Sequence, residues 1–122
     1  GFSTAISLGG DTVIGRRPAE YLRLFAEDPE TRVVVYVGEI GGTKEEELAA
    51  ALVECDKPLV AMIVGHSAPA GRTLGHAGAL IGSDADRAEA KSARLAAAGA
   101  ATCTGPAGLV AALGRLLGGR VT

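Results

Sequence analysis

The chain is poor in aromatic side chains and in net charge. Phe, Trp and Tyr together make up 3% of the 122 residues, and tryptophan is absent. Base-stacking platforms for nucleic acids need aromatic side chains, and electrostatic binding to DNA or to anionic membranes needs a basic surface. The net charge of −2 offers no such surface. We therefore expect no nucleic-acid partner and no membrane partner.

Cysteine and long apolar runs are also scarce. Cys55 and Cys103 lie far apart and outside any metal-ligand spacing, so we expect reduced, buried thiols and no metal site. No apolar run approaches the ~20 residues that span a membrane. The sequence opens on Gly1-Phe2, without a signal-peptide pattern or an initiating methionine. We expect a fragment or a processed form of a cytoplasmic protein.

Strand and helix patterns alternate along the chain. Apolar, β-branched segments typical of strands lie at residues 3–8, 32–37, 58–64 and 100–103. Helical patterns occupy residues 18–27, 43–54, 85–98 and 106–117. The length suits one domain. The alternation predicts a single α/β domain over residues 1–122, doubly wound and flavodoxin-like, with a parallel sheet and helices on both faces.

The helix ends and charged helix positions give finer expectations. Thr43 is expected to cap the second helix, with Glu46 completing a capping box. Ser83 or Asp84 is expected to cap the third helix, and Gly99 to end it. We expect exposed positions without a special role for the charged side chains of these helices: Glu45, Glu46 and Glu47 in the second, and Arg87, Lys91 and Arg94 in the third.

Two glycine-containing segments follow the second and third predicted strands. They are residues 38–42 and residues 65–82, and the longer one contains five glycines. Ligands of open parallel sheets bind beyond the carboxyl ends of the strands. A long glycine-rich loop in a compact domain is usually functional or disordered. A ligand site is therefore expected where these two segments meet.

A histidine flanked by small residues stands in the longer segment. In the run Gly75-His76-Ala77-Gly78, the absence of side-chain bulk lets the backbone amides of residues 75, 77 and 78 turn toward an anion such as phosphate. An imidazole can carry a phosphoryl group covalently. Glu39 is a credible acceptor for the other ring nitrogen. An exposed polar loop histidine remains the alternative at this point.

The two segments together resemble a known family. Gly38-Glu39-Ile40-Gly41-Gly42, Ala68-Pro69 and Gly75-His76-Ala77-Gly78-Ala79 are similar, in this order, to stretches of succinyl-CoA synthetase alpha subunits, which belong to the NDP-forming acyl-CoA synthetase superfamily. The resemblance extends over nearly the whole chain. It implies a CoA-ligase domain in which His76 is the phosphorylated residue and Glu39 positions its ring.

The resemblance also implies a reaction and partners. Family members form an acyl phosphate, whose phosphoryl group passes to or from the histidine and is exchanged with a nucleotide. CoA and ATP or GTP with Mg would be substrates of the complete enzyme, bound mainly outside this chain, and no tightly bound cofactor is expected. The implied partners are a CoA-binding Rossmann-like domain and an ATP-grasp domain or beta subunit, with a homo-oligomer also open. The family's first strand and helix, which precede the segment matching Gly1, are expected to be missing.

Departures from the family pattern leave alternatives open. Residues 83–86 are acidic where the family has a glycine- and lysine-rich turn, and residues 78–84 resemble ADP-forming acetate-CoA ligases, so the acyl substrate stays undecided. The alternative function is a non-catalytic scaffold or assembly module, and an unrelated flavodoxin-like interaction domain is a third reading. His66 is interpreted as a polar loop residue and Arg72 as a solvated loop charge.

Overall fold

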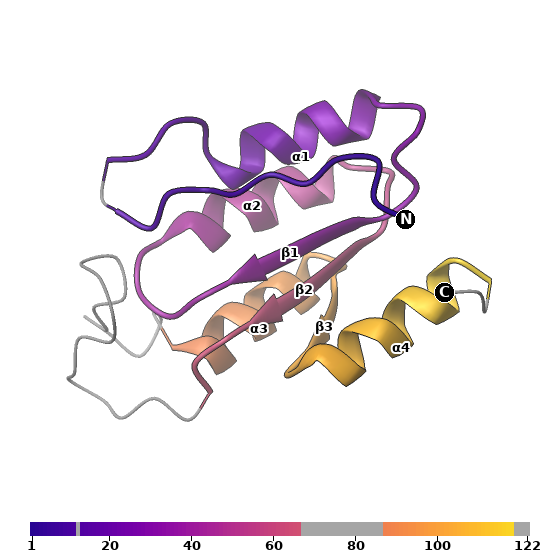
Figure 1. Ribbon diagram of the computed structural model, residues 1–122. Coiled ribbons are helices and arrows are strands. Elements are labelled where there is room, and N and C mark those ends of the chain that lie inside the picture. The colour runs from indigo at the N-terminus through magenta and orange to yellow at the C-terminus, as the bar shows by residue number, and fades with distance from the viewer. Residues whose placement is uncertain (12, 67–86, 119–122) are drawn as a thin grey trace.

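The computed structural model describes residues 1–11, 13–66 and 87–118. Seven elements follow one another in these residues (Figure 1): α1 (Pro18–Glu27), β1 (Val34–Gly38), α2 (Lys44–Val53), β2 (Leu59–Ile63), α3 (Ala88–Ala97), β3 (Ala101–Cys103) and α4 (Pro106–Leu116). Each lies within or close to the range predicted for it. Gly99 ends α3 in the left-handed region, with a φ of 105°, which favours glycine.

The three strands form a parallel sheet in the order β1-β2-β3. Val34 pairs with Leu59 and Gly38 with Ile63, so β1 and β2 run side by side over their full lengths. Val60 pairs with Ala101 at the start of the shorter β3. Because the strands are parallel, their carboxyl ends meet at one edge of the sheet, and the loops that follow β1 and β2 are neighbours there.

Helices cover both faces of the sheet, which confirms the predicted doubly wound α/β class. Helices α2 and α3 pack against each other, and α3 contacts β2 and β3 on the same side. Helix α4 contacts β2 and β3 from the opposite side (Figure 1). Helix α1 packs on α2 as an outer layer.

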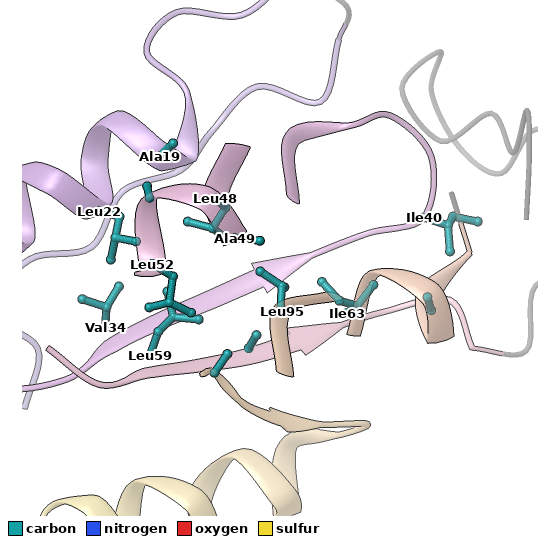
Figure 2. Close-up of a cluster of buried hydrophobic side chains, with 14 residues drawn as sticks. Ala19, Leu22, Val34, Ile40, Leu48, Ala49, Leu52, Leu59, Ile63 and Leu95 are labelled. Atoms are coloured by element: carbon teal, nitrogen blue, oxygen red, sulfur yellow. The ribbon is translucent and has the colours of Figure 1, made fainter. Parts of the chain in front are cut away.

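The principal core lies between the sheet and the helices α1, α2 and α3. Alternate residues of β2, namely Leu59, Ala61 and Ile63, enter this cluster, as period-two geometry requires (Figure 2). Leu95 of α3 is completely buried in the same cluster. Val60, between them in sequence, is also completely buried but lies outside the cluster. It faces α4, so β2 is a central strand covered on both sides.

Two local expectations are wrong. Residues 3–8 form no strand, since residues 1–7 are exposed and the segment pairs with no strand of the sheet. A strand needs a paired neighbour for the hydrogen bonds of its backbone N–H and C=O groups. Thr43 makes no side-chain cap hydrogen bond. Its carbonyl accepts from the Glu46 amide at 3.1 Å, and its backbone (φ −123°, ψ 14°) is not in the extended conformation of a side-chain cap.

The other helix-cap expectations have mixed outcomes. Pro18 begins α1 as expected, and the backbone amide of Arg17, which precedes it, donates a hydrogen bond to Glu20 Oε2 at 2.7 Å. Helix α3 begins at Ala88, and the expected caps Ser83 and Asp84 lie outside the described residues. In the part of the chain that the structure describes, no helix has both the length and the apolar character needed to cross a membrane.

Two leucines of α1 provide a test of this packing. Leu22 is 1% exposed and lies in the core cluster, whereas Leu24 of the same helix is 47% exposed. We expect Leu22→Ala to lower the free energy of unfolding by about 2–5 kcal/mol, since the cavity it leaves cannot fully collapse. Leu24→Ala is the matched control and should change it by less than about 1 kcal/mol. Urea unfolding of both variants measures the difference; equal losses would contradict the described layering.

Candidate active site

The loop after β1 carries the predicted acceptor Glu39 at the carboxyl edge of the sheet. Gly38 is the last residue of β1, and its carbonyl accepts a hydrogen bond from the Val64 amide at 2.9 Å. Glu39 follows directly and is half-buried. Gly41 and Gly42 have φ angles of 81° and 66°, in the left-handed region that favours glycine. The glycine pair therefore reverses the chain between β1 and α2.

This loop contacts the start of the loop after β2. Ile40 is 4% exposed and belongs to the same core cluster as Ile63, the last residue of β2 (Figure 2). A Cβ atom added to Gly65 would lie 2.6 Å from Ile40 Cγ2, too close for any real side chain, so glycine is what permits the contact. The expectation that the two loops adjoin is confirmed for residues 38–40 and 64–65.

A buried lysine of α3 holds the loop after β1 from the interior of the domain. Lys91 is 1% exposed, although a solvent-facing position was predicted for it. Its Nζ donates to the Glu39 carbonyl at 3.0 Å, to the Gly41 carbonyl, and to Glu45 Oε2 at 2.6 Å. An ammonium group has three donors and no acceptor. All three are used here, which is what allows a charge to remain in the interior.

Glu45 is the second buried charge and also corrects a prediction. It lies in the first turn of α2 and is 2% exposed, not at the surface. One of its carboxylate oxygens accepts from Lys91, and the other accepts from the Tyr36 hydroxyl at 2.7 Å. Tyr36 comes from β1, so three elements meet in this Tyr36–Glu45–Lys91 network. A Cβ atom on Gly38 would meet Tyr36, Ile63 and Glu45 atoms within 2.9 Å.

Burial and the neighbouring carboxylate change the acidity of Tyr36. Desolvation raises the pKa of its phenol well above the ordinary value, and the negative charge of Glu45 and the hydrogen bond to it raise it further. The phenol therefore stays protonated and remains a donor to Glu45 through the physiological range. The hydrogen bond from Tyr36 to Glu45 therefore does not change with pH in this range.

A histidine lies at the carboxyl end of β2. His66 Nδ1 is 3.4 Å from Glu89 Oε1 of α3, and the histidine side chain is 26% exposed. A hydrogen bond from its own backbone and the nearby His66 ring lower the pKa of Glu89. Among the described residues, Nε2 of His66 is buried without a hydrogen-bond partner. His66 is thus a polar residue of the loop after β2, as expected, and its half-buried ring lies beside Glu89.

The structure locates only part of the predicted site. Glu39 lies at the carboxyl edge of the sheet, as expected. The phosphate-binding candidates Gly75, Ala77 and Gly78, and His76 itself, lie outside the described residues, as does Arg72. The distance between Glu39 and His76 therefore stays a prediction. No group of three or more His, Cys, Asp or Glu side chains that could hold a metal ion occurs in residues 1–11, 13–66 and 87–118.

Sequence reasoning missed Lys91, Glu45 and Tyr36, although the spacing contained a signal. Lys91 lies three residues after buried Ala88 and four before buried Leu95, so it occupies the buried stripe of α3. Glu45 precedes buried Leu48 and Ala49 in the same way in α2. Opposite charges on the apolar faces of two adjacent helices predict a buried ion pair. The charge of Lys91 and Glu45 suggests the surface, but their spacing from buried residues indicates the core.

The fold is a parallel α/β domain in which the loops after two adjacent strands, β1 and β2, start at the same edge of the sheet. A family model described as CoA-ligase matches residues 1–101. The chain belongs to this CoA-ligase family and is of the succinyl-CoA synthetase alpha-subunit type, which confirms the resemblance seen in its motifs.

Individual relatives agree with this family. The alpha 1 subunit of an ADP-forming succinate–CoA ligase from Archaeoglobus fulgidus is 48% identical over 100 residues, which are 82% of this chain and 34% of the relative. The SauD subunit of an ADP-forming sulfoacetate-CoA ligase from Bilophila wadsworthia is 42% identical, over 97% of this chain and 41% of the relative. The chain thus spans between a third and about two fifths of these proteins.

A solved structure shares the fold. The ATP citrate lyase from Methanothrix soehngenii, in complex with citrate and coenzyme A, superposes with a TM-score of 0.76 at 28% identity. The match covers 93% of this chain and 20% of that one. The chain thus shares its fold with one part of a much longer protein.

The raised pKa of Tyr36 gives a pH prediction. In the unfolded chain a tyrosine ionises near pH 10, but the folded protein keeps this phenol protonated. The unfolded state then loses a proton that the folded state retains, so stability is full below about pH 10 and falls as pH rises above it. We expect urea unfolding midpoints to fall between about pH 9 and about pH 11.

The two tyrosines of the chain allow a matched control. Tyr36→Phe should be less stable at about pH 9, since Glu45 loses a buried hydrogen bond worth about 1–3 kcal/mol, but its further loss toward high pH should be smaller. Tyr21→Phe, on α1, should retain the full pH-dependent fall because Tyr36 is still present. If Tyr36→Phe shows the same fall as the unsubstituted chain, another group is responsible.

Proposed function

We propose that this chain is the histidine-bearing domain of an NDP-forming acid–CoA ligase, in which His76 carries the phosphoryl group and Glu39 positions its ring. One observation supports this above all. Glu39 lies on a loop that is fixed at the carboxyl edge of the sheet, directly beside the start of the loop that leads to His76. A carboxylate there is suited to accept a hydrogen bond from one imidazole nitrogen and leave the other free to react.

The proposed chemistry uses the imidazole as a nucleophile. In the direction of thioester synthesis, a nitrogen of His76 attacks the terminal phosphorus of a nucleoside triphosphate, and the bond to the leaving diphosphate breaks as the N–P bond forms. The acid substrate's carboxylate then takes the phosphoryl group, the N–P bond breaks, and the CoA thiol displaces phosphate from the acyl phosphate. Amides of residues 75, 77 and 78 would stabilise the phosphoryl oxygens.

The named substrates of the relatives support a role in the shared step. Ligases named for succinate, sulfoacetate and malate match this chain at similar identities of 48%, 42% and 44%. A domain that selected the acid would be expected to diverge with it. We therefore assign to this chain the phosphoryl transfer that these ligases have in common, and leave the choice of acid to parts beyond it.

The complete protein would need partners for this reaction. The relatives include subunits named alpha, which points to a beta subunit or an equivalent ATP-grasp domain as the nucleotide-binding partner. A Rossmann-like domain would bind CoA. ATP or GTP with Mg would be bound by these parts, in the cytoplasm, and this chain would supply the histidine.

Phosphate labelling of the complete ligase tests the proposal. With a γ-labelled nucleotide and Mg, we expect an acid-labile, base-stable phosphate on the protein, located at His76 by peptide mapping and abolished in His76→Ala. The chain has two histidines, so His66→Ala is the matched control and should still be labelled. Glu39→Gln should slow labelling by about 10²-fold, since a misdirected ring loses near-attack geometry.

Other outcomes would favour the alternatives. Label that persists in His76→Ala, or no label in the unsubstituted ligase, contradicts the proposal. Stable oligomers or CoA binding that are unaffected by His76→Ala, together with absent labelling, would identify a non-catalytic scaffold.

A further inference from the structure

We infer that Lys91 is a positioning residue for phosphoryl transfer: from the interior of the domain, it fixes the backbone of Glu39, the residue proposed to orient the ring of His76. The inference rests on the function proposed above and extends it to three residues, Lys91, Glu45 and Tyr36, that take no direct part in the proposed chemistry.

The backbone on both sides of Glu39 is fixed by hydrogen bonds. The peptide plane before it is held through the Gly38 carbonyl, which accepts from the Val64 amide at 2.9 Å. The plane after it is held through its own carbonyl, which accepts from Lys91 Nζ at 3.0 Å. Peptide units are planar, and the described chain contains no cis peptide bond. With both planes fixed, the direction of the Glu39 Cα–Cβ bond is set.

The second carbonyl contact extends this control to the turn. Lys91 Nζ also donates to the carbonyl of Gly41, two residues beyond Glu39, where the chain enters its left-handed turn. Two carbonyls separated by one residue thus point at the same ammonium group. Without the ammonium group, both carbonyls would lose this donor, and the loop would be expected to turn them toward water.

The ammonium group is in turn held at a fixed place. Glu45 Oε2 lies 2.6 Å from Nζ, and the Tyr36 hydroxyl occupies the other carboxylate oxygen at 2.7 Å. Lys91 is 1% and Glu45 2% exposed, so water does not compete for these bonds. The position of Glu39 therefore depends on the packing of α2, α3 and β1 as well as on its own loop.

The helix pair α2–α3 also provides a matched control. Arg94 of α3 lies 3.5 Å from Glu46 of α2, one residue along from Glu45, but both side chains are partly exposed at 35% and 52%. Arg94→Met removes an α3–α2 ion pair without touching the Glu39 loop. Lys91→Met removes the buried pair while keeping an unbranched apolar side chain of similar length.

The experiment is carried out in the complete ligase with its nucleotide-binding partner. We expect Lys91→Met to increase hydrogen exchange at the backbone amides of residues 39–42 and to slow phosphorylation of His76 by about 10²-fold. Arg94→Met should leave both unchanged. If Lys91→Met cannot be isolated as a folded protein, the double variant K91M/E45Q removes both buried charges at once and should show the same two effects.

A second measurement separates positioning from a general loss of structure. In a Glu39→Ala background, a residue that acts through Glu39 has nothing left to position, so Lys91→Met should slow phosphorylation by less than about twofold beyond Glu39→Ala alone. An equal slowing in both backgrounds overturns the inference, as does wild-type labelling in Lys91→Met. Failure of the proposed function gives a different result from failure of this inference, because the unsubstituted ligase would then carry no phosphate on His76. In that case the inference fails as well.

Discussion

The ammonium group of Lys91 is the constraint on which the carboxyl edge of this domain depends. It lies in the interior with three acceptors, two of them backbone carbonyls of the loop after β1 and one the carboxylate of Glu45. A buried charge is tolerated only when its donors are satisfied and its countercharge is close. The loop, α2 and α3 must therefore keep their relative positions, and a shift of either helix would change the shape of the loop.

Glycines make room for this arrangement. A Cβ atom at Gly38 would lie 2.6 Å from the Tyr36 ring and 2.9 Å from Glu45. The end of β1 must therefore lack a side chain for the Tyr36–Glu45–Lys91 network to pack against it. Gly65 gives the same freedom to Ile40, and its φ of 102° requires glycine in any case. The glycine motifs at the ends of β1 and β2 are thus explained by packing and by backbone geometry, before any ligand is considered.

The fold could be predicted from the sequence because its signals are local. Apolar periodicity, Pro18 and Gly99 identify helix positions to within a few residues. Residues 3–8 were predicted wrongly because a strand depends on a paired neighbour, which its own sequence does not encode. Lys91 and Glu45 were placed at the surface on residue type, although their spacing from buried residues indicated the core. The place of Glu39 at the carboxyl edge of the sheet could be predicted because it directly follows β1, while its relation to His76 stays a prediction.

The buried network is better explained by loop geometry than by stability. Replacing a buried ion pair with apolar residues is often neutral or stabilising in proteins, so an apolar core between α2 and α3 could hold the helices equally well. Apolar side chains could not, however, donate to the inward-facing carbonyls of Glu39 and Gly41, and buried carbonyls require donors. Both carbonyls belong to the loop that makes the left-handed turn at Gly41 and Gly42. The buried polar network therefore follows from the backbone geometry of the loop that carries Glu39.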